Sequence, residues 1–232
     1  MDCIEGMQQM KDKSVDMILC DLPYGITGCK WDSLIPFDLL WNEYERIIKD
    51  NGAIVLTSSQ PFTTQLINSN RKLFKYTWYW IKNQVTGFPF AKFQPLRCVE
   101  DICVFYKRTP TYNPQGLIEL DKPKVCKRKI NSSELVYDKN TLSGEYVTRF
   151  TNYPRQTLEF KCQRDGLHPT QKPVALFEYL IKTYTNEGNV VLDNCMGSGT
   201  TAVACVNTSR NFIGFELDEG YWRVGVSRVK KE

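Results

Sequence analysis

Asp21-Leu22-Pro23-Tyr24 directly follows the apolar run 15–20 and combines an acidic side chain, a rigid turn and an aromatic ring. The carboxylate of Asp21 can accept a charge-assisted hydrogen bond, and the carbonyl of Leu22, held by the ring of Pro23, offers a second acceptor. Such acceptors can draw a conjugated amino group toward tetrahedral geometry, while Tyr24 offers a flat face for a base swung out of a duplex. Taken alone, the run also fits an Asp-x-Pro turn with Tyr24 in the core.

A glycine-rich loop forms the second cluster, between the apolar run 190–192 and a predicted helix. Gly197 and Gly199 let the backbone turn sharply and pass close to a ligand, and the following helix offers its N-terminus. About twenty residues further on, Glu216 lies at the end of the next apolar run, where a carboxylate can accept both ribose hydroxyls. Nicotinamide or flavin dinucleotides and S-adenosylmethionine all fit this loop, as does a tight turn that binds nothing. A nucleoside triphosphate loop does not fit, because no lysine follows the second glycine.

Short apolar runs alternating with helical patterns must position both clusters. The runs typical of buried parallel strands are 15–20, 53–57, 76–81, 102–106, 190–192 and 212–217. Apolar residues at helical spacing predict helices over 37–49, 174–184 and 200–206. The pattern predicts an α/β fold with a doubly wound sheet, in which ligands bind at the carboxyl ends of the strands.

Composition excludes several classes of protein. The chain has 232 residues, 42% of them hydrophobic, and a net charge of +4, which suits one domain or one domain with an insertion. No window approaches the roughly 20 apolar residues that span a bilayer, and the first ten residues do not resemble a signal sequence. The nine cysteines include no CxxC pair and His168 is the only histidine, so neither a disulfide framework nor a zinc site is indicated. We therefore expect a soluble cytoplasmic protein with reduced thiols and no membrane association.

Basic charge is concentrated in the segment 108–164, which has eleven basic and six acidic residues. The segment lacks strong apolar periodicity, which predicts irregular structure or short strands inserted into the more regular fold. Its densest basic run is Lys127-Arg128-Lys129. The charge alone fits a solvated loop as well as a surface that binds nucleic acid.

Together, these motifs resemble the amino-specific DNA methyltransferases of the beta class, in which the catalytic motif precedes the cofactor motif. Asp21 to Tyr24 is similar to the family's Asp-Pro-Pro-Tyr motif, with Leu22 in place of the first proline. The run 168–173 (HPTQKP) is similar to its cofactor-side motif and 193–200 to its glycine-rich loop, in the same order. The likeness continues through 52–62, 78–83, 95–107 and 212–222, so it covers most of the chain outside the basic segment.

The resemblance implies a mostly parallel seven-stranded sheet of the S-adenosylmethionine-dependent methyltransferase type, with an inserted target recognition region. It divides the chain into a catalytic half (1–107), the recognition region (108–164) and a cofactor-binding half (165–232). Within the recognition region we expect Lys127, Arg128 and Lys129 to contact DNA, because this run is its densest basic part. Asp21 and the Leu22 carbonyl, held by Pro23, would bind the target amino group, and Tyr24 would stack on the flipped base. The residues implied in binding S-adenosylmethionine are His168, Lys172, Pro173, Asp193, Cys195, Gly197, Ser198, Gly199, Thr200 and Glu216.

The resemblance further implies methyl transfer to double-stranded DNA in a restriction-modification context. Aspartate at position 21 favours the N6 amino group of adenine, since the cytosine N4 enzymes usually carry serine there, and N4 of cytosine is the alternative. RNA bases and protein glutamine are further alternatives, whose enzymes usually begin the motif with asparagine. No Pro-Cys pair is present for carbon-5 chemistry, so we expect direct displacement on the sulfonium methyl without a metal. Homodimerisation and a cognate restriction nuclease are left open.

Overall fold

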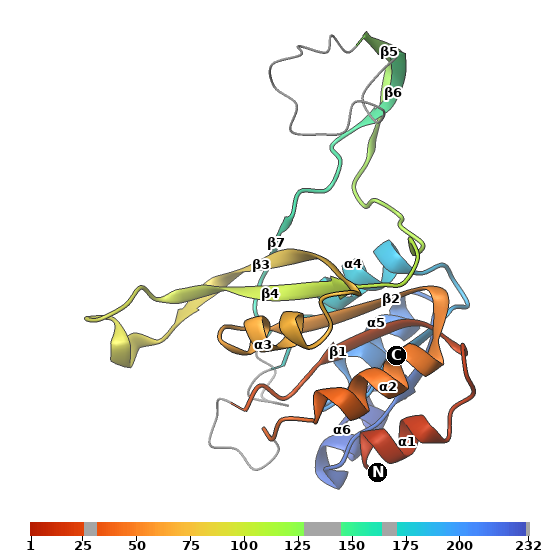
Figure 1. The fold of residues 1–232 in the computed structure, drawn as a ribbon. Helices are drawn as coiled ribbons and strands as arrows, with labels where there is room; N and C mark the ends of the chain where they lie inside the picture. Colours follow the sequence, from red (N-terminus) through yellow and green to blue (C-terminus); the bar gives the residue numbers. More distant parts are fainter. Residues whose placement is uncertain (26–31, 128–144, 164–170, 231–232) are drawn as a thin grey trace. The chain divides into compact units, whose positions relative to one another are not determined.

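A seven-stranded sheet forms the centre of the larger of two units (Figure 1). The structure is a computed structural model and describes residues 1–25, 32–127, 145–163 and 171–230. The larger unit comprises Met1–Asn113 and Gln156–Glu232, and the smaller one Pro114–Arg155.

The sheet has the strand order β7-β3-β4-β2-β1-β8-β9. Its strands are β1 (Val15–Asp21), β2 (Ile48–Ser58), β3 (Phe74–Thr86), β4 (Arg97–Phe105), β7 (Thr157–Phe160), β8 (Val190–Asp193) and β9 (Asn211–Gly214). Neighbouring strands pair in parallel except where β4 pairs with β2 and β3. The expected mostly parallel seven-stranded α/β fold is therefore confirmed, and among the described strands of this sheet β4 is the one that runs antiparallel to its neighbours.

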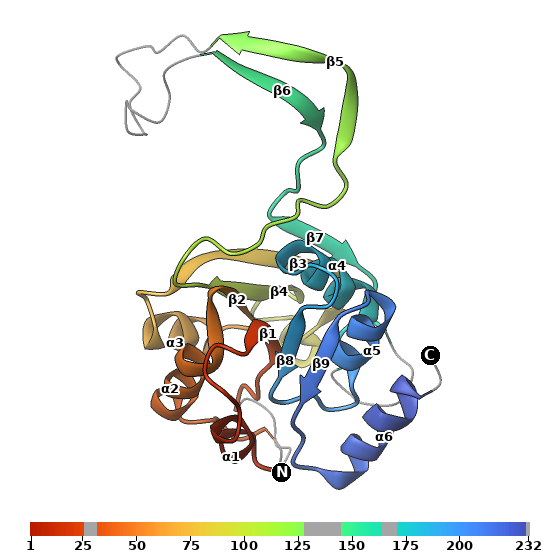
Figure 2. The same ribbon diagram turned by 90° about the vertical axis from the view of Figure 1, so that its right-hand side faces the viewer.

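Helices cover both faces of the sheet, which makes it doubly wound (Figure 2). They are α1 (Cys3–Gln8), α2 (Phe37–Ile47), α3 (Phe62–Ser69), α4 (Val174–Tyr184), α5 (Thr200–Asn207) and α6 (Glu219–Val229). Along β1, Ile18 and Cys20 pack with α1, α2 and α3, whereas Met17 and Leu19 pack with α4 and α5. This alternation follows from the two-residue period of a strand.

Two predicted elements end earlier than their apolar patterns suggested. Helix α2 ends at Ile47, not at position 49, because Ile48 has extended backbone angles and pairs with Val15 as the first residue of β2. Strand β9 ends at Gly214, whereas the predicted run continues to position 217. Glu216 therefore lies two residues beyond the strand and not within it. In both places the apolar run continues across the boundary, and hydrogen bonding between strands decides where the element ends.

The smaller unit, Pro114–Arg155, lies within the range 108–164 predicted for the recognition region. It consists of β5 (Ile118–Lys127) paired antiparallel with β6 (Glu145–Thr151). Residues 108–113 and 156–163 belong instead to the larger unit, where β7 pairs in parallel with β3. Within the part of the chain that the structure describes, no helix has the length and apolar character to cross a membrane.

Candidate active site

The carboxyl ends of β1, β2 and β8 bring both sequence motifs to one edge of the sheet. Asp21 is the last residue of β1 and lies opposite Thr57 of β2, while Asp193 is the last residue of β8. Because β4 runs in the opposite direction, its first residues lie at this same edge, with Asp101 opposite Ser58. We call this side of the larger unit the catalytic edge.

Both carboxylate oxygens of Asp21 accept hydrogen bonds. Oδ1 accepts from the hydroxyl of Tyr24, at 2.7 Å, and from the hydroxyl of Thr57. Oδ2 accepts from Nζ of Lys172 at 2.6 Å. Asp21 is held from three directions, yet a quarter of its side chain remains exposed. The carboxylate is therefore fixed in orientation while staying accessible at the edge.

Lys172 connects Asp21 to a second carboxylate. Its Nζ lies 3.4 Å from Oε2 of Glu100, whose Oε1 lies 2.7 Å from Nζ of Lys82. The Lys172 side chain is 6% exposed. Burial by itself lowers the pKa of Lys172, but the charges of Asp21 and Glu100 more than offset this, and its pKa is raised. Lys172 thus carries its charge within the site and joins the catalytic motif directly.

The ring of Tyr24 is held by aromatic and cationic neighbours. It stacks on Phe62, with ring centroids 5.2 Å apart and an interplanar angle of 24°. Nζ of Lys172 lies 5.7 Å from the ring centroid. Burial, followed by the charge of Asp21, raises the pKa of Tyr24 well above its ordinary value, so the phenol stays protonated and donates to Asp21. Its orientation is fixed at both the hydroxyl and the ring.

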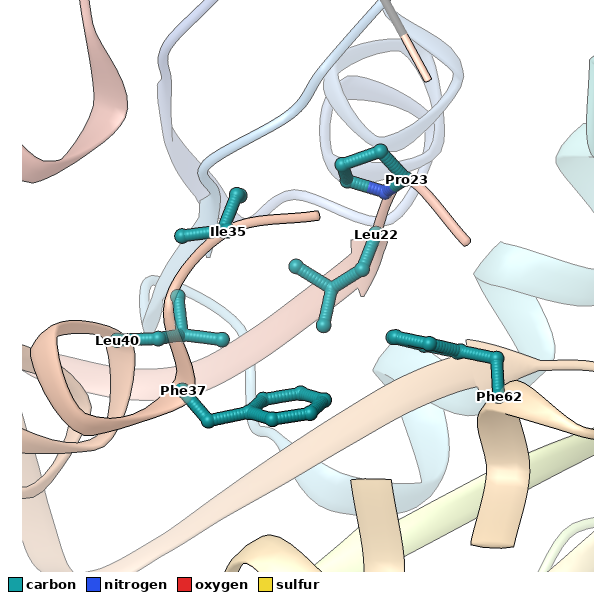
Figure 3. Close-up of a pocket in the computed structure, with 6 residues that line it drawn as sticks. All are labelled: Leu22, Pro23, Ile35, Phe37, Leu40 and Phe62. Carbon is teal, nitrogen blue, oxygen red and sulfur yellow. The ribbon is translucent and has the colours of Figure 1, made fainter. Parts of the chain in front are cut away.

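Leu22 and Pro23 lie over a small apolar pocket (Figure 3). The Leu22 side chain is buried, 4% exposed, and the pocket is completed by Ile35, Phe37, Leu40 and Phe62. Phe37 and Phe62 stack with centroids 5.9 Å apart. Leucine at this position therefore anchors the motif through apolar packing and leaves the main-chain carbonyl in place.

The glycine-rich loop is held by two carboxylates. Asp193, 3% exposed, accepts from the main-chain N–H of Cys195 at 3.0 Å and from the hydroxyl of Thr201. Burial raises the pKa of Asp193 to about 6. Glu216 accepts from the main-chain N–H groups of Gly197 and Asp218, each at 2.8 Å. Each carboxylate therefore orients backbone of the loop or of the segment that follows β9.

The two glycines of this loop have left-handed backbone angles. Gly197 has φ +50° and Gly199 has φ +78°, a region that side chains rarely adopt. A Cβ on Gly199 would also lie 2.8 Å from Cα of Gly225 in α6. The bare backbone of Gly199 therefore packs α5 against α6, and the close approach of a ligand to this loop stays a prediction.

The remaining predicted cofactor residues surround this loop. Ser198 is buried and its carbonyl accepts from Arg228 at 2.7 Å, while the hydroxyl of Thr200 lies 3.5 Å from the carbonyl of Lys172. Pro173 is buried and precedes α4 as its N-cap. The Thr200 contact joins the glycine-rich loop to the Lys172-Pro173 segment, so the structure brings the two predicted cofactor motifs together.

Several predicted residues lie outside the described part of the chain. These are His168, Arg128 and Lys129; Lys127 is the last residue of β5, and its side chain is not described. In contrast, Thr57, Phe62, Lys82 and Glu100 contact the catalytic motif or its ion pairs and were not predicted. Thr57 ends a predicted strand, a signal that could have found it, whereas the position of Glu100 depends on the antiparallel direction of β4.

Comparison with known proteins shows which family this sequence matches. A family model described as DNA methylase, of the N6 and N4 type, matches residues 15–227. DNA adenine methyltransferase YhdJ of Escherichia coli strain K12 is 26% identical over 247 residues, covering 98% of this chain and 80% of that protein.

Two solved structures share the fold. The M1.HpyAVI complex with S-adenosylmethionine is 25% identical, with a TM-score of 0.67, over 98% of this chain and 96% of that one. The cytosine-N4-specific PvuII DNA methyltransferase is 16% identical, with a TM-score of 0.70, over 98% of this chain and 84% of that one.

Proposed function

The chain belongs to the DNA methylase family of N6 and N4 amino methyltransferases, and we propose that it methylates the exocyclic N6 amino group of adenine in DNA. It is a DNA methyltransferase whose cofactor is S-adenosylmethionine. The observation that carries the adenine proposal is the oriented carboxylate of Asp21, which lies at the catalytic edge beside Tyr24.

The residues of the glycine-rich loop suit this cofactor. Gly197 and Gly199 have positive φ angles, which let the loop turn sharply, and the buried Asp193 accepts from the main-chain N–H of Cys195. Each carboxylate oxygen has two acceptor sites, so Glu216 can take ribose hydroxyls while it binds the N–H groups of Gly197 and Asp218. We assign the loop, with Cys195, Ser198 and Thr200, and the Lys172-Pro173 segment to the cofactor site.

Asp21 binds the target amino group in the proposed mechanism. The bound cofactor supplies an electrophilic methyl group on a sulfonium centre. Because protein donors occupy both oxygens of Asp21 in this structure, an incoming amino group replaces or shares one of them. Tyr24, Thr57 and Lys172 keep the carboxylate oriented, so little reorganisation is needed during the reaction.

Charge at the amino nitrogen changes during the displacement. The nitrogen would form a bond to the methyl carbon as the bond between that carbon and the sulfonium sulfur breaks, so that the cofactor leaves as an uncharged thioether. The nitrogen then carries the positive charge until one of its protons passes to water at the exposed edge. The carboxylate of Asp21 faces this developing charge and stabilises it, and the Leu22 carbonyl accepts from the second N–H. Tyr24 stacks on the base once it has left the duplex, which orients the amino group for in-line attack.

Methylation of cytosine N4 is the second candidate. The family includes N4 enzymes, and the PvuII enzyme that shares this fold is cytosine-N4-specific. The two reactions use similar amino groups, and the aspartate at position 21 favours adenine. RNA bases and protein glutamine are less favoured, because the family match is to DNA methylases.

The smaller unit is proposed as the target recognition region, by its place in the sequence between the two motifs. Pro114–Arg155 contains eight basic and five acidic residues, a charge that suits phosphate contacts. Homodimerisation and a cognate restriction nuclease are left open.

Modified-base sequencing tests the proposal directly. DNA from cells that express the chain should carry N6-methyladenine at one sequence, absent from cells that express an Asp21→Ala variant. Mass spectrometry of the hydrolysed nucleosides separates N6-methyladenine from N4-methylcytosine. Detection of N4-methylcytosine alone would replace the adenine proposal with the second candidate, and detection of neither base would refute both.

A further inference from the structure

The β3–β4 hairpin extends beyond the catalytic row of the sheet. Asp21 lies opposite Thr57, Thr57 opposite Ile102 and Ile102 opposite Trp78, so these four residues form one row across the strands. The tip of the hairpin at Gly87 lies nine residues further along β3 than Trp78. At about 3.3 Å per residue this is a reach of roughly 25–30 Å in the direction of the catalytic edge. Figure 1 shows the paired ends of β3 and β4 projecting past β2 and β1.

Three phenylalanines at this tip are exposed to solvent. Phe88, Phe90 and Phe93 are 65%, 54% and 86% exposed, and we call them the aromatic tip. Phe88 and Phe90 lie in the short helix η1 (Phe88–Phe90), which follows the left-handed Gly87. Exposure of large aromatic side chains to water is unfavourable, and clustered exposed apolar side chains mark sites of interaction. The exposure of these three rings therefore indicates a binding partner.

The charge around the aromatic tip favours a polyanion. From Ile81 to Val99 the sequence contains Lys82, Lys92 and Arg97 and no acidic residue. Lys92 and Arg97 are exposed beside the aromatic tip, while Lys82 is held near the base of the hairpin by Glu100. Aromatic rings interleaved with cations are the side chains that stack on bases and contact phosphates.

We propose that the aromatic tip stacks against bases of the substrate DNA and stabilises the duplex opened around the target base. The proposal rests on the DNA methyltransferase function, because a target base can reach Asp21 only after leaving the base stack. The tip reaches past the catalytic row by more than the depth of a DNA groove, about 8 Å, so its rings can enter the duplex beside the extruded base.

A comparison of paired and mismatched substrates tests this role. In the full chain, Phe90→Ala/Phe93→Ala should lower kcat/KM on a duplex carrying the mapped methylation site by about 5- to 150-fold, the range expected for loss of base stacking. The same variant should recover most of that loss on a duplex with a mismatch at the target base, because less opening is then required. Phe90→Tyr/Phe93→Tyr retains the rings and should retain activity.

Val206→Ala is the control. Val206 is 42% exposed and lies near the C-terminal end of α5, at the edge opposite Asp21, and its loss should leave activity on both duplexes unaffected. Affinity for S-adenosylmethionine, measured by calorimetry, should be unchanged in every variant, which also reports an intact fold.

Full activity of Phe90→Ala/Phe93→Ala on the paired duplex, or an equal loss on both duplexes, would overturn the proposal. Conversion of a parent dimer to a monomer by this variant, measured by sedimentation, would assign the aromatic tip to a second copy of the chain. If the parent chain methylates neither duplex, the proposed function itself fails, independently of the hairpin.

Discussion

At the scale of single residues, the orientation of the Asp21 carboxylate depends on hydrogen-bond donors that are both near and far from it in the sequence. Tyr24 is three residues away in sequence, whereas Thr57 and Lys172 come from distant segments. The local motif therefore supplies the carboxylate, and the fold supplies most of its orientation. Substitution of Asp21 and substitution of its partners should have different consequences.

Asp21→Ala should lower the rate of methyl transfer by about 100- to 1,000-fold or more, the loss expected when a group oriented toward developing charge is removed. Affinity for S-adenosylmethionine should change little, because the glycine-rich loop does not depend on this carboxylate. Single-turnover kinetics and calorimetry measure the two effects separately. Asp50→Ala is a suitable control, since it removes an exposed carboxylate paired with Lys13 near the start of β2. Near-normal turnover of Asp21→Ala would contradict the assigned role.

Lys172→Met should destabilise the folded protein by about 3 kcal/mol, because it leaves the carboxylates of Asp21 and Glu100 without their shared cation in a buried site. We expect the lower end of the range for buried pairs, since Lys82 still pairs with Glu100. Urea unfolding measures the free energy of unfolding.

Lys49→Met provides a matched control for this prediction. It breaks an ion pair with Asp16 that has the same kind of geometry, at 2.7 Å, but the lysine side chain is 40% exposed. Its expected cost is under about 1 kcal/mol. Equal costs for the two substitutions would mean that burial does not strengthen the Lys172 pair.

At the scale of elements, the glycine-rich loop positions α5 through steric contact as well as through hydrogen bonds. Gly199 combines a left-handed φ with direct contact to Gly225, so two independent constraints exclude a side chain. Gly188 has nearly the same φ, +77°, but a Cβ there would meet nothing within 4 Å. Substitutions at Gly188 and Gly199 therefore distinguish the effect of a strained backbone from the effect of helix packing.

Gly199→Ala should therefore cost several kcal/mol of folding free energy and weaken cofactor binding, while Gly188→Ala should cost about 1 kcal/mol and leave binding unchanged. Thermal unfolding with and without S-adenosylmethionine compares both quantities in each variant. If Gly199 is a packing residue, the loss of folding free energy must be larger at position 199 than at position 188. Similar losses at the two positions would mean that the positive φ alone accounts for the effect.

The strand ends explain how far the sequence could predict this site. Asp21 and Asp193 each end a short apolar run, and parallel strands must place such ends at one edge, so their proximity follows from the pattern. Glu100 could not be placed in this way, because β4 is antiparallel and nothing in its apolar run indicates direction. The sequence predicted only a cofactor role for Lys172. Its contact with Asp21 could not be predicted, because it depends on how distant segments pack. The exposed Phe93 was not singled out, because sequence alone does not distinguish a core phenylalanine from a surface one.

At the scale of the whole molecule, charge is divided unevenly between the two units. The smaller unit, Pro114–Arg155, has an excess of three basic residues, eight against five, within a chain of net charge +4. A small unit with two described strands contributes little core, so its sequence is better suited to surface contacts than to stability. DNA binding should accordingly depend on salt through this unit.

Replacement of Lys127, Arg128 and Lys129 by alanine should weaken binding to every DNA sequence and reduce the slope of log affinity against log salt by up to about 3 units, since each neutralised phosphate contributes about 0.9. Affinity for S-adenosylmethionine should stay the same. The matched control replaces Arg71, Lys72 and Lys75, which are exposed around the start of β3, at the edge opposite Asp21, and removes the same charge. Titration of labelled duplex at several salt concentrations measures affinity and slope for both variants. Because the two variants have equal net charge, a general electrostatic effect would flatten both slopes alike, whereas phosphate contacts by the 127–129 run would flatten only the first. An unchanged slope in the first variant would exclude this run from the DNA surface and leave recognition to other residues of the smaller unit.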